Sequence, residues 1–230
     1  DRTSPSRVIA ALRKEGARID LPAGEAELDN DAALAAAFAR NRVVAGIAIS
    51  NENGNALPPA KAGFAFGGES PKDYLPAFSG GVANLPELSN AATGIGFFSF
   101  PLSGDGVVRS LPLLARSGEN IYPALSIEAL RVAQDAGSFI VRSTGASGEA
   151  NTRRPAMTAL KDGAFAMPTG PDGSFRVYYS GMPRMRTIAA ADILDPGKAT
   201  PLEQEISGHI VLVGTSAVGL RDLVATPFRQ

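Results

Sequence analysis

Apolar residues recur along the chain at two different spacings, and each spacing predicts one kind of secondary structure. Near the N-terminus, a first-turn proline and apolar residues at helical intervals predict a helix that ends at Gly16. A second amphipathic pattern predicts a helix over 31–40, capped by Asp29 or Asn30. The β-branched apolar run at 42–49 is too short for a helix and predicts a buried strand.

Glycine, proline and asparagine punctuate the next part of the chain. Their density over 51–90 predicts a long irregular surface segment, anchored by scattered aromatic residues. Two pairs of extended runs predict β-hairpins, one over 93–117 that turns at 103–106 and one over 164–181 that turns at 171–173.

The remaining periodic segments complete an alternation of helices and strands. A helix is expected over 122–137, with Leu125, Ala129, Leu130 and Ala133 on its inner face. The other expected elements are a strand over 138–143, a polar loop over 145–156, a short helix over 187–194 and a last buried strand over 206–216. The pattern predicts a mixed α/β fold: one domain over 1–230 with a central mixed β-sheet, flanking helices and two β-hairpins.

Composition narrows the classes of function. The 22 basic and 23 acidic residues nearly cancel, so no nucleic-acid partner is expected. The absence of cysteine removes disulfides, thiol catalysis and cysteine metal sites, and a single histidine without cysteine cannot make an ordinary zinc site. We therefore expect no metal and no cofactor.

The segment 209–228 resembles a catalytic turn, but its residues do not complete one. A nucleophile elbow fails because Val218 stands where its last glycine belongs, and the phosphate-loop lysine is also missing. His209 and Ser216 would lie at opposite ends of a strand, about 17 Å apart at about 3.3 Å per residue. We therefore expect no catalytic residues in this domain.

The polar residues of this region, and those of the turn at 105–109, each allow two interpretations. Thr215 and Ser216 either cap a helix or turn, or present their hydroxyls to an anionic ligand. Asp105 either forms only a turn, with Arg109 on a solvent-facing strand, or Arg109 forms a buried ion pair with Asp222. We favour the buried pair, because Arg109 and Asp222 both follow strongly apolar segments.

The closing segment 214–228, preceded by the strand 209–213, resembles the end of the type-two CHASE domain, an extracytoplasmic sensory domain. The same order of pieces extends from about Asp29 onward: the helix and strand before 51, then "GFFSFPLSGDGVVRSLPLL", "YPALSIEAL", "FRVYYSG" and "AADIL". The segment 51–92 carries no signature of that family.

The resemblance implies a place for the domain in a larger receptor. A transmembrane helix precedes such domains, three more usually follow, and the output module is a class III nucleotide cyclase, a histidine kinase or a serine/threonine kinase. Members normally open with a strand–helix–strand unit that this sequence lacks, so we expect an unpaired sheet edge and leave a homodimer open. No apolar run here approaches the ~20 residues that cross a bilayer, so any anchor is expected in flanking helices.

The expected function is therefore extracytoplasmic sensing for a bacterial membrane receptor, most simply one that regulates a nucleotide cyclase. The signal would be an unidentified small molecule or protein, and the candidate ligand-binding residues are Asp105, Arg109, Thr215, Ser216 and Asp222. Three rivals stay open: a kinase sensor, a structural dimerisation module without ligand, and a periplasmic solute-binding protein.

Overall fold

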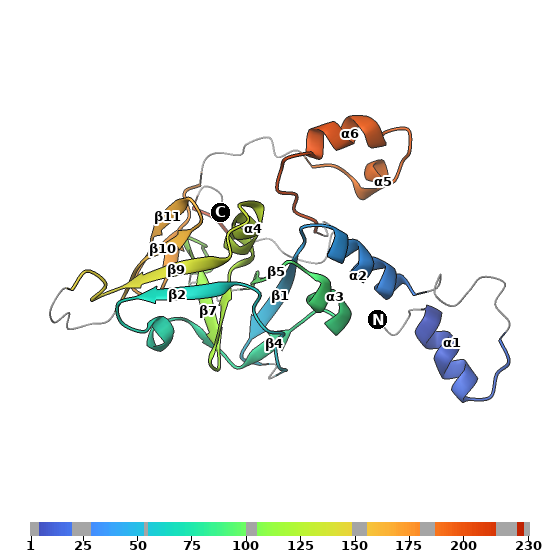
Figure 1. Ribbon diagram of the computed structural model, residues 1–230, viewed down its shortest axis with the longest axis horizontal. Coiled ribbons are helices and arrows are strands. Elements are labelled where there is room, and N and C mark those ends of the chain that lie inside the picture. The colour runs from blue at the N-terminus through green and yellow to red at the C-terminus, as the bar shows by residue number, and fades with distance from the viewer. Residues whose placement is uncertain are drawn as a thin grey trace. The chain divides into compact units, whose positions relative to one another are not determined.

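The computed structural model describes residues 5–19, 29–52, 55–99, 105–148, 156–179, 187–214 and 225–227. The chain divides into two compact units, Asp1–Phe100 with Pro112–Ser174, and Pro101–Leu111 with Phe175–Gln230. Helices and small mixed sheets are interleaved along the chain (Figure 1), so the predicted mixed α/β class is confirmed.

The helices and strands follow one another as a long series of short elements. The helices are α1 (Pro5–Lys14), α2 (Asn30–Arg40), α3 (Pro86–Ala91), α4 (Leu125–Ala133), α5 (Ala190–Ile193), α6 (Ala199–Ile206) and the 3-10 helix η2 (Pro71–Asp73). The strands are β1 (Val44–Ser50), β2 (Gly63–Gly67), β3 (Ala77–Phe78), β4 (Gly80–Val82), β5 (Gly94–Phe97), β6 (Ser110–Pro112), β7 (Leu114–Ser117), β8 (Asn120–Pro123), β9 (Ser138–Ser143), β10 (Met157–Asp162), β11 (Phe165–Pro168) and β12 (Ser174–Arg176).

The first two helices and the first strand lie where the sequence pattern places them. Asp29 caps α2, because its carboxylate accepts a hydrogen bond from the Ala32 N–H at 3.0 Å. β1 alternates buried with half-buried residues, so Ala45, Ile47 and Ile49 enter the core. The predicted buried strand is thereby confirmed.

Two mixed sheets in the first unit share one core. β1 pairs in parallel with β5 and antiparallel with β4. A bridge between Phe97 and Ala124 extends β5 toward the hairpin of β7 and β8. The second sheet has the order β11-β10-β9-β2, in which β2 lies parallel to β9 and Phe64 stands opposite Phe139.

Helix α4 covers the core between these sheets. It contacts β5, β1 and β10, and Figure 1 draws it across the strands of the first unit. Ile127 and Val132 are buried on its inner face, as are the two charged residues Glu128 and Arg131. The predicted inner face is wrong in its most buried positions, since Leu125, Ala129 and Leu130 are only half-buried and Ala133 is exposed. Glu128 and Arg131 can enter the core instead because their charges pair.

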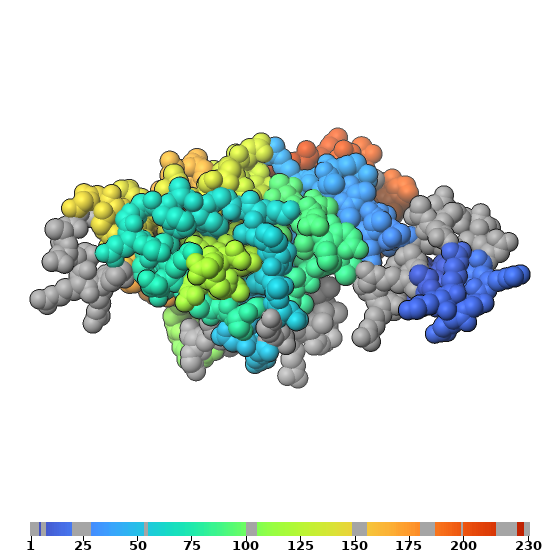
Figure 2. All heavy atoms as spheres, turned by 60° about the horizontal axis from the view of Figure 1, so that its bottom comes forward, coloured from blue at the N-terminus to red at the C-terminus, as the bar shows by residue number. Residues whose placement is uncertain are grey.

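The segment predicted to be irregular contains regular structure, and that prediction is wrong. Residues 51–90 include η2, three strands and the start of α3. In β2, Phe64 and Phe66 alternate with small residues, and Phe64 stacks on Phe139 at 5.7 Å. The alternation is only five residues long and lies among turn-forming residues, so a search for periodic apolar positions does not detect it. In Figure 2, the yellow-green tip of the β7–β8 hairpin lies against teal residues of this segment, where Lys72 pairs with Glu119 at 2.6 Å.

Hairpins are present, but not between the strands that were predicted to form them. β7 pairs with β8, and β10 pairs with β9 and β11, all antiparallel. The predicted turn at 171–173 exists, since the Gly173 N–H donates to the Gly170 carbonyl at 3.0 Å. The strands beside it pair elsewhere, β11 with β10 and β12 with β6. The turn at 103–106 lies partly outside the described residues.

The second unit contains the two-stranded sheet of β6 and β12, together with α5 and α6. The predicted last strand is wrong over its described part: α6 ends at Ile206, and Ile210 to Val213 form no strand and are exposed. No described strand pairs with this segment, so its β-branched composition alone does not make it a strand. Among the described helices, none is long and apolar enough to cross a bilayer.

Candidate functional site

The turn that carries Asp105 and Arg109 is described in full from Asp105 onward. One Asp105 carboxylate oxygen accepts the Val107 N–H at 3.0 Å, and the other accepts Arg109 Nη1 at 2.7 Å. Gly106 has a φ of +71°, which suits glycine in such a turn. The Val107 N–H, and after it Arg109, lowers the pKa of the Asp105 carboxyl below its ordinary value.

This ion pair is exposed. The side chains of Arg109 and Asp105 are 47% and 52% accessible to solvent. Our expectation of a buried arginine is therefore wrong, because Val108, not Arg109, occupies the buried face of this segment. Asp222, the expected partner of Arg109, lies outside the described residues.

The main chain beside the turn joins three segments of the second unit. The Val108 N–H donates to the Ala225 carbonyl at 2.9 Å, and the Val177 N–H donates to the Arg109 carbonyl at 3.0 Å. The Tyr179 hydroxyl donates to the Val108 carbonyl at 2.9 Å. The structure thus brings Ala225 to the Asp105–Arg109 turn, while Thr215 and Ser216, like Asp222, lie outside the described part of the chain.

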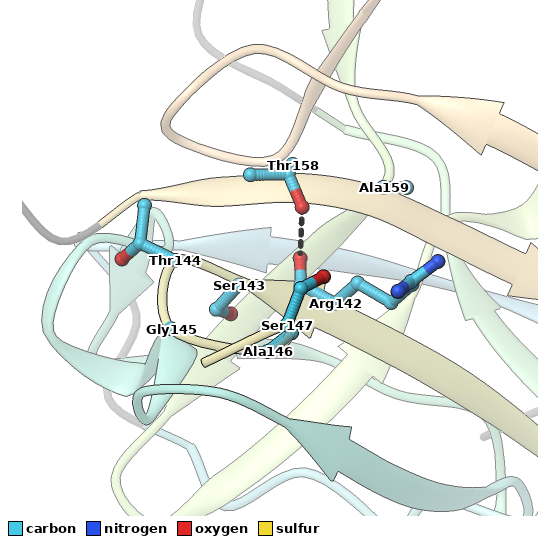
Figure 3. Close-up of a pocket in the computed structure, with 8 residues that line it drawn as sticks. All are labelled: Arg142, Ser143, Thr144, Gly145, Ala146, Ser147, Thr158 and Ala159. Atoms are coloured by element: carbon cyan, nitrogen blue, oxygen red, sulfur yellow. Dashed lines mark hydrogen bonds between the residues drawn. The ribbon is translucent and has the colours of Figure 1, made fainter. Parts of the chain in front are cut away.

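A hollow of about 360 Å³ lies at the end of β9, where the chain turns away from β10 (Figure 3). Its rim is formed by Arg142, Ser143, Thr144, Gly145, Ala146, Ser147, Thr158 and Ala159. Internal hydrogen bonds occupy its hydroxyls: Thr158 Oγ1 donates to the Arg142 carbonyl at 3.1 Å, and Ser143 Oγ accepts from Tyr74 at 2.5 Å. Two of the hydroxyls on its rim are therefore already engaged in hydrogen bonds within the protein.

The charged residues of α4 form a different kind of site, closed to solvent. Arg131 Nε and Nη2 donate to the two carboxylate oxygens of Glu128 at 2.8 and 2.7 Å. Arg131 Nη1 donates to the Ala136 carbonyl at 2.5 Å. Hydrogen bonding to Glu128 raises the pKa of the Arg131 guanidinium, so Arg131 keeps its positive charge inside the core.

Asp162 adds a second carboxylate at the end of β10. Its side chain is fully buried, and neither carboxylate oxygen has a hydrogen-bond partner among the described residues. Burial raises the pKa of Asp162 to about 6, nearby Arg131 lowers it, and Glu128 raises it further. We call these three residues, Glu128, Arg131 and Asp162, the buried charge cluster.

Small residues let the elements of the cluster approach closely. A Cβ at Gly94 of β5 would lie 2.5 Å from a Glu128 carboxylate oxygen, and one at Gly96 would lie 2.6 Å from the Leu125 Cα. At the other end of α4, Gln134 Nε2 donates to the Asp162 carbonyl at 3.3 Å, and Gln134 Oε1 accepts the Ala164 N–H at 2.9 Å. Helix α4 is therefore tied to both sheets beside the cluster.

Sequence reasoning missed the buried charge cluster. Charged residues in an amphipathic helix are assigned to the solvent side, and Asp162 precedes a glycine and so resembles a turn residue. The available signal was the i,i+3 spacing of Glu128 and Arg131 among apolar residues, which allows the two charges to pair.

Fold and site together define a mixed α/β domain with an ion pair and an unpaired carboxylate in its core. A model of the CHASE2 domain family matches residues 1–230, so the chain belongs to the CHASE2 family. The resemblance in the sequence is thereby confirmed. Members of the CHASE2 family are extracellular sensor domains and are not catalytic. No curated protein and no solved structure matches the chain.

Proposed function

We propose that this domain is the extracytoplasmic sensor of a bacterial transmembrane receptor that regulates a cytoplasmic nucleotide cyclase. The observation that carries the proposal is the family match over residues 1–230, because CHASE2 domains are extracellular sensors. The receptor lies in the plasma membrane, anchored by helices outside residues 1–230, and makes cAMP or cGMP.

The mechanism is a shift between two arrangements of the domain. A signal that binds one arrangement more tightly than the other biases the equilibrium between them, by no more than its difference in affinity. The helices that leave the domain carry this bias to the cyclase. The signal is a small molecule or a protein, and two receptor chains pair to form the working unit.

The candidate ligand site is the exposed turn of Asp105 and Arg109. Thr215, Ser216 and Asp222, which lie outside the described residues, are further candidates from the sequence. Arg109 has a planar guanidinium that suits a carboxylate or phosphate group, and its present partner Asp105 is a solvent-exposed carboxylate that an anionic ligand would replace. A screen of small anions by thermal denaturation tests this site. Ligand stabilisation that is lost in Arg109→Ala and kept in Arg42→Ala supports it, and equal stabilisation of both variants contradicts it.

The receptor role is tested on the full-length protein in membranes. We expect cyclic nucleotide synthesis, and we expect its rate to change when an unrelated extracytoplasmic domain replaces residues 1–230. Phosphoryl transfer to a histidine, or to serine and threonine, would instead assign a kinase output. Cyclic nucleotide synthesis at the same rate with and without the native domain would contradict sensing.

A further inference from the structure

The buried charge cluster holds one cation and two carboxylates in a core closed to water. Glu128 takes two hydrogen bonds from Arg131, and the third nitrogen of the guanidinium donates to the Ala136 carbonyl. Each nitrogen of the guanidinium therefore has an acceptor other than Asp162. Asp162 is 0% exposed and accepts no hydrogen bond on either oxygen within the described part of the chain.

A buried carboxylate in this position costs free energy while it is ionised. Transfer of an unpaired charge out of water is so unfavourable that such groups become neutral by binding a proton, unless a cation compensates them. In the cluster, the three ionised groups together carry one uncompensated negative charge. The protonated form of Asp162 removes it.

We infer that Asp162 is a proton-binding site, through which the domain takes up a proton as the external medium becomes acidic. Its role as a signal to the cyclase rests on the proposed receptor function. The proton-binding site itself rests only on the packing of β10 against α4.

A proton fits this site better than a metal ion. The described residues contain no group of three or more acidic, histidine or cysteine residues arranged to hold a metal. Both Glu128 oxygens already accept from Arg131, so a metal ion would find only the two oxygens of Asp162. The Arg131 guanidinium would also repel it.

The elements packed near Asp162 differ in whether they bring charged or uncharged residues to the cluster. Helix α4 brings Arg131 and Glu128, whose charges act on Asp162 in opposite directions. The neighbouring strands β9 and β11 place the uncharged residues Phe139 and Phe165 opposite Asp162. Strand β5 brings Gly94 against Glu128. Burial therefore dominates, and the pKa of Asp162 rises to about 6.

The sign of the resulting pH dependence follows from this direction. The folded domain holds the Asp162 proton more tightly than the unfolded chain, whose pKa is near the ordinary 3.8. Between these two values the folded state binds more protons, so stability falls as pH rises and the loss is complete above about 7. The full effect is an increase of about a hundredfold in the unfolding equilibrium constant, because the pKa rises from 3.8 to about 6 and each pKa unit corresponds to a factor of about ten.

Chemical denaturation of the 230-residue chain between pH 4.5 and 8 tests the inference. The Asp162→Asn variant keeps the shape of the protonated acid, so we expect it to fold, to lose the pH dependence and to be more stable than wild type above pH 7. The control variant Asp135→Asn changes an exposed carboxylate outside the candidate ligand site and should keep the wild-type loss of stability. In Glu128→Gln the fall should end at a lower pH and be smaller, because loss of the neighbouring negative charge lowers the folded-state pKa of Asp162.

A measurement on the wild-type protein guards against a variant that fails to fold. Carboxyl ¹³C NMR should show one aspartate that titrates near pH 6, with a signal absent from Asp162→Asn spectra. An Asp162 signal that titrates near pH 4, or the same denaturation profile in wild type and Asp162→Asn, overturns the inference. So does a dependence on added Mg²⁺ or Ca²⁺ at fixed pH that Asp162→Asn abolishes, because the site would then take a metal.

The experiments distinguish a failure of the proposed receptor function from a failure of the proton-binding site. If Asp162 titrates as expected but the full-length protein makes no cyclic nucleotide, the proposed cyclase output is wrong and the proton site remains. If cyclic nucleotide synthesis depends on the domain but Asp162 does not titrate near pH 6, the proton site is wrong and the sensor remains.

Discussion

Glu128 and Arg131 form the most enclosed ion pair among the described residues, with side chains 0% and 8% exposed. Such a pair contributes little net stability, because the desolvation of two ions offsets their attraction. Replacement of only one of the two charged residues has a larger effect on stability. When one partner is lost, the other remains buried and uncompensated.

Arg131→Met therefore tests the pair at the level of a single residue. We expect it to lower the free energy of unfolding by about 3–5 kcal/mol, because Glu128 and Asp162 are then left without a cation. Chemical denaturation at pH 7.5 measures the change. The matched variant Arg42→Met breaks an exposed pair with Asp135, whose side chains are 59% and 74% exposed, and should cost about 1 kcal/mol or less. Equal losses in the two variants would refute the buried pair.

At the scale of elements, the contact between β5 and α4 depends on the absence of side chains. A Cβ at Gly96 would lie 2.6 Å from the Leu125 Cα and 2.9 Å from its nitrogen, both of them backbone atoms. Neither can move without a shift of the whole helix. The same contact holds Glu128 in its place beside Gly94.

Gly96→Ala should therefore lower the free energy of unfolding by about 1–3 kcal/mol through overpacking. Gly137→Ala is the matched control, since a Cβ there meets nothing within 4 Å. Thermal denaturation followed by circular dichroism compares the two. A Gly96→Ala protein as stable as Gly137→Ala would show that α4 does not pack closely on β5.

The elements differ in how far the sequence predicted them, for physical reasons. β1 and α2 were predictable because apolar periodicity and a capping aspartate act locally. β2 was not, because its pairing with β9 joins residues more than seventy positions apart and its own pattern is short. The pairing around the 170–173 turn failed because neither strand pairs across it: β11 pairs with the adjacent strand β10, and β12 pairs with β6, which lies more than sixty positions away.

The candidate site shows the same division. The Asp-Gly turn and the solvent-facing Arg109 agree with one of the two readings of the sequence, since local turn chemistry determines both. The buried charge cluster needs a tertiary contact between α4 and β10, and no local pattern specifies it. Thr215, Ser216 and Asp222 remain predictions.

At the scale of the whole molecule, an apolar run stands exposed in the second unit. Val213 is 96% exposed and Leu212 is 75% exposed, and the run Ile210 to Val213 belongs to no described strand. Exposed runs with high β-propensity tend to pair with another chain. We therefore propose that this exposed run allows the chain to self-associate.

We expect the 230-residue chain to sediment as a dimer or larger species at micromolar concentration. A Leu212→Lys/Val213→Lys double variant should shift it toward the monomer, because two charges would be buried in any strand pairing. Tyr178→Lys changes an equally exposed but separate residue, 89% accessible, and should leave the association unchanged. A wild-type chain that is monomeric at all concentrations would contradict the prediction.

In the proposed function, an external domain controls an enzyme on the other side of the membrane. Cyclic nucleotide synthesis in sealed vesicles, with the domain outside and the interior buffered at constant pH, tests this most directly. We predict that the full-length protein makes cAMP or cGMP at a rate that changes as the external pH crosses about 6, and that Asp162→Asn abolishes the change while Asp135→Asn keeps it. A full-length protein that makes no cyclic nucleotide at any external pH would contradict the account.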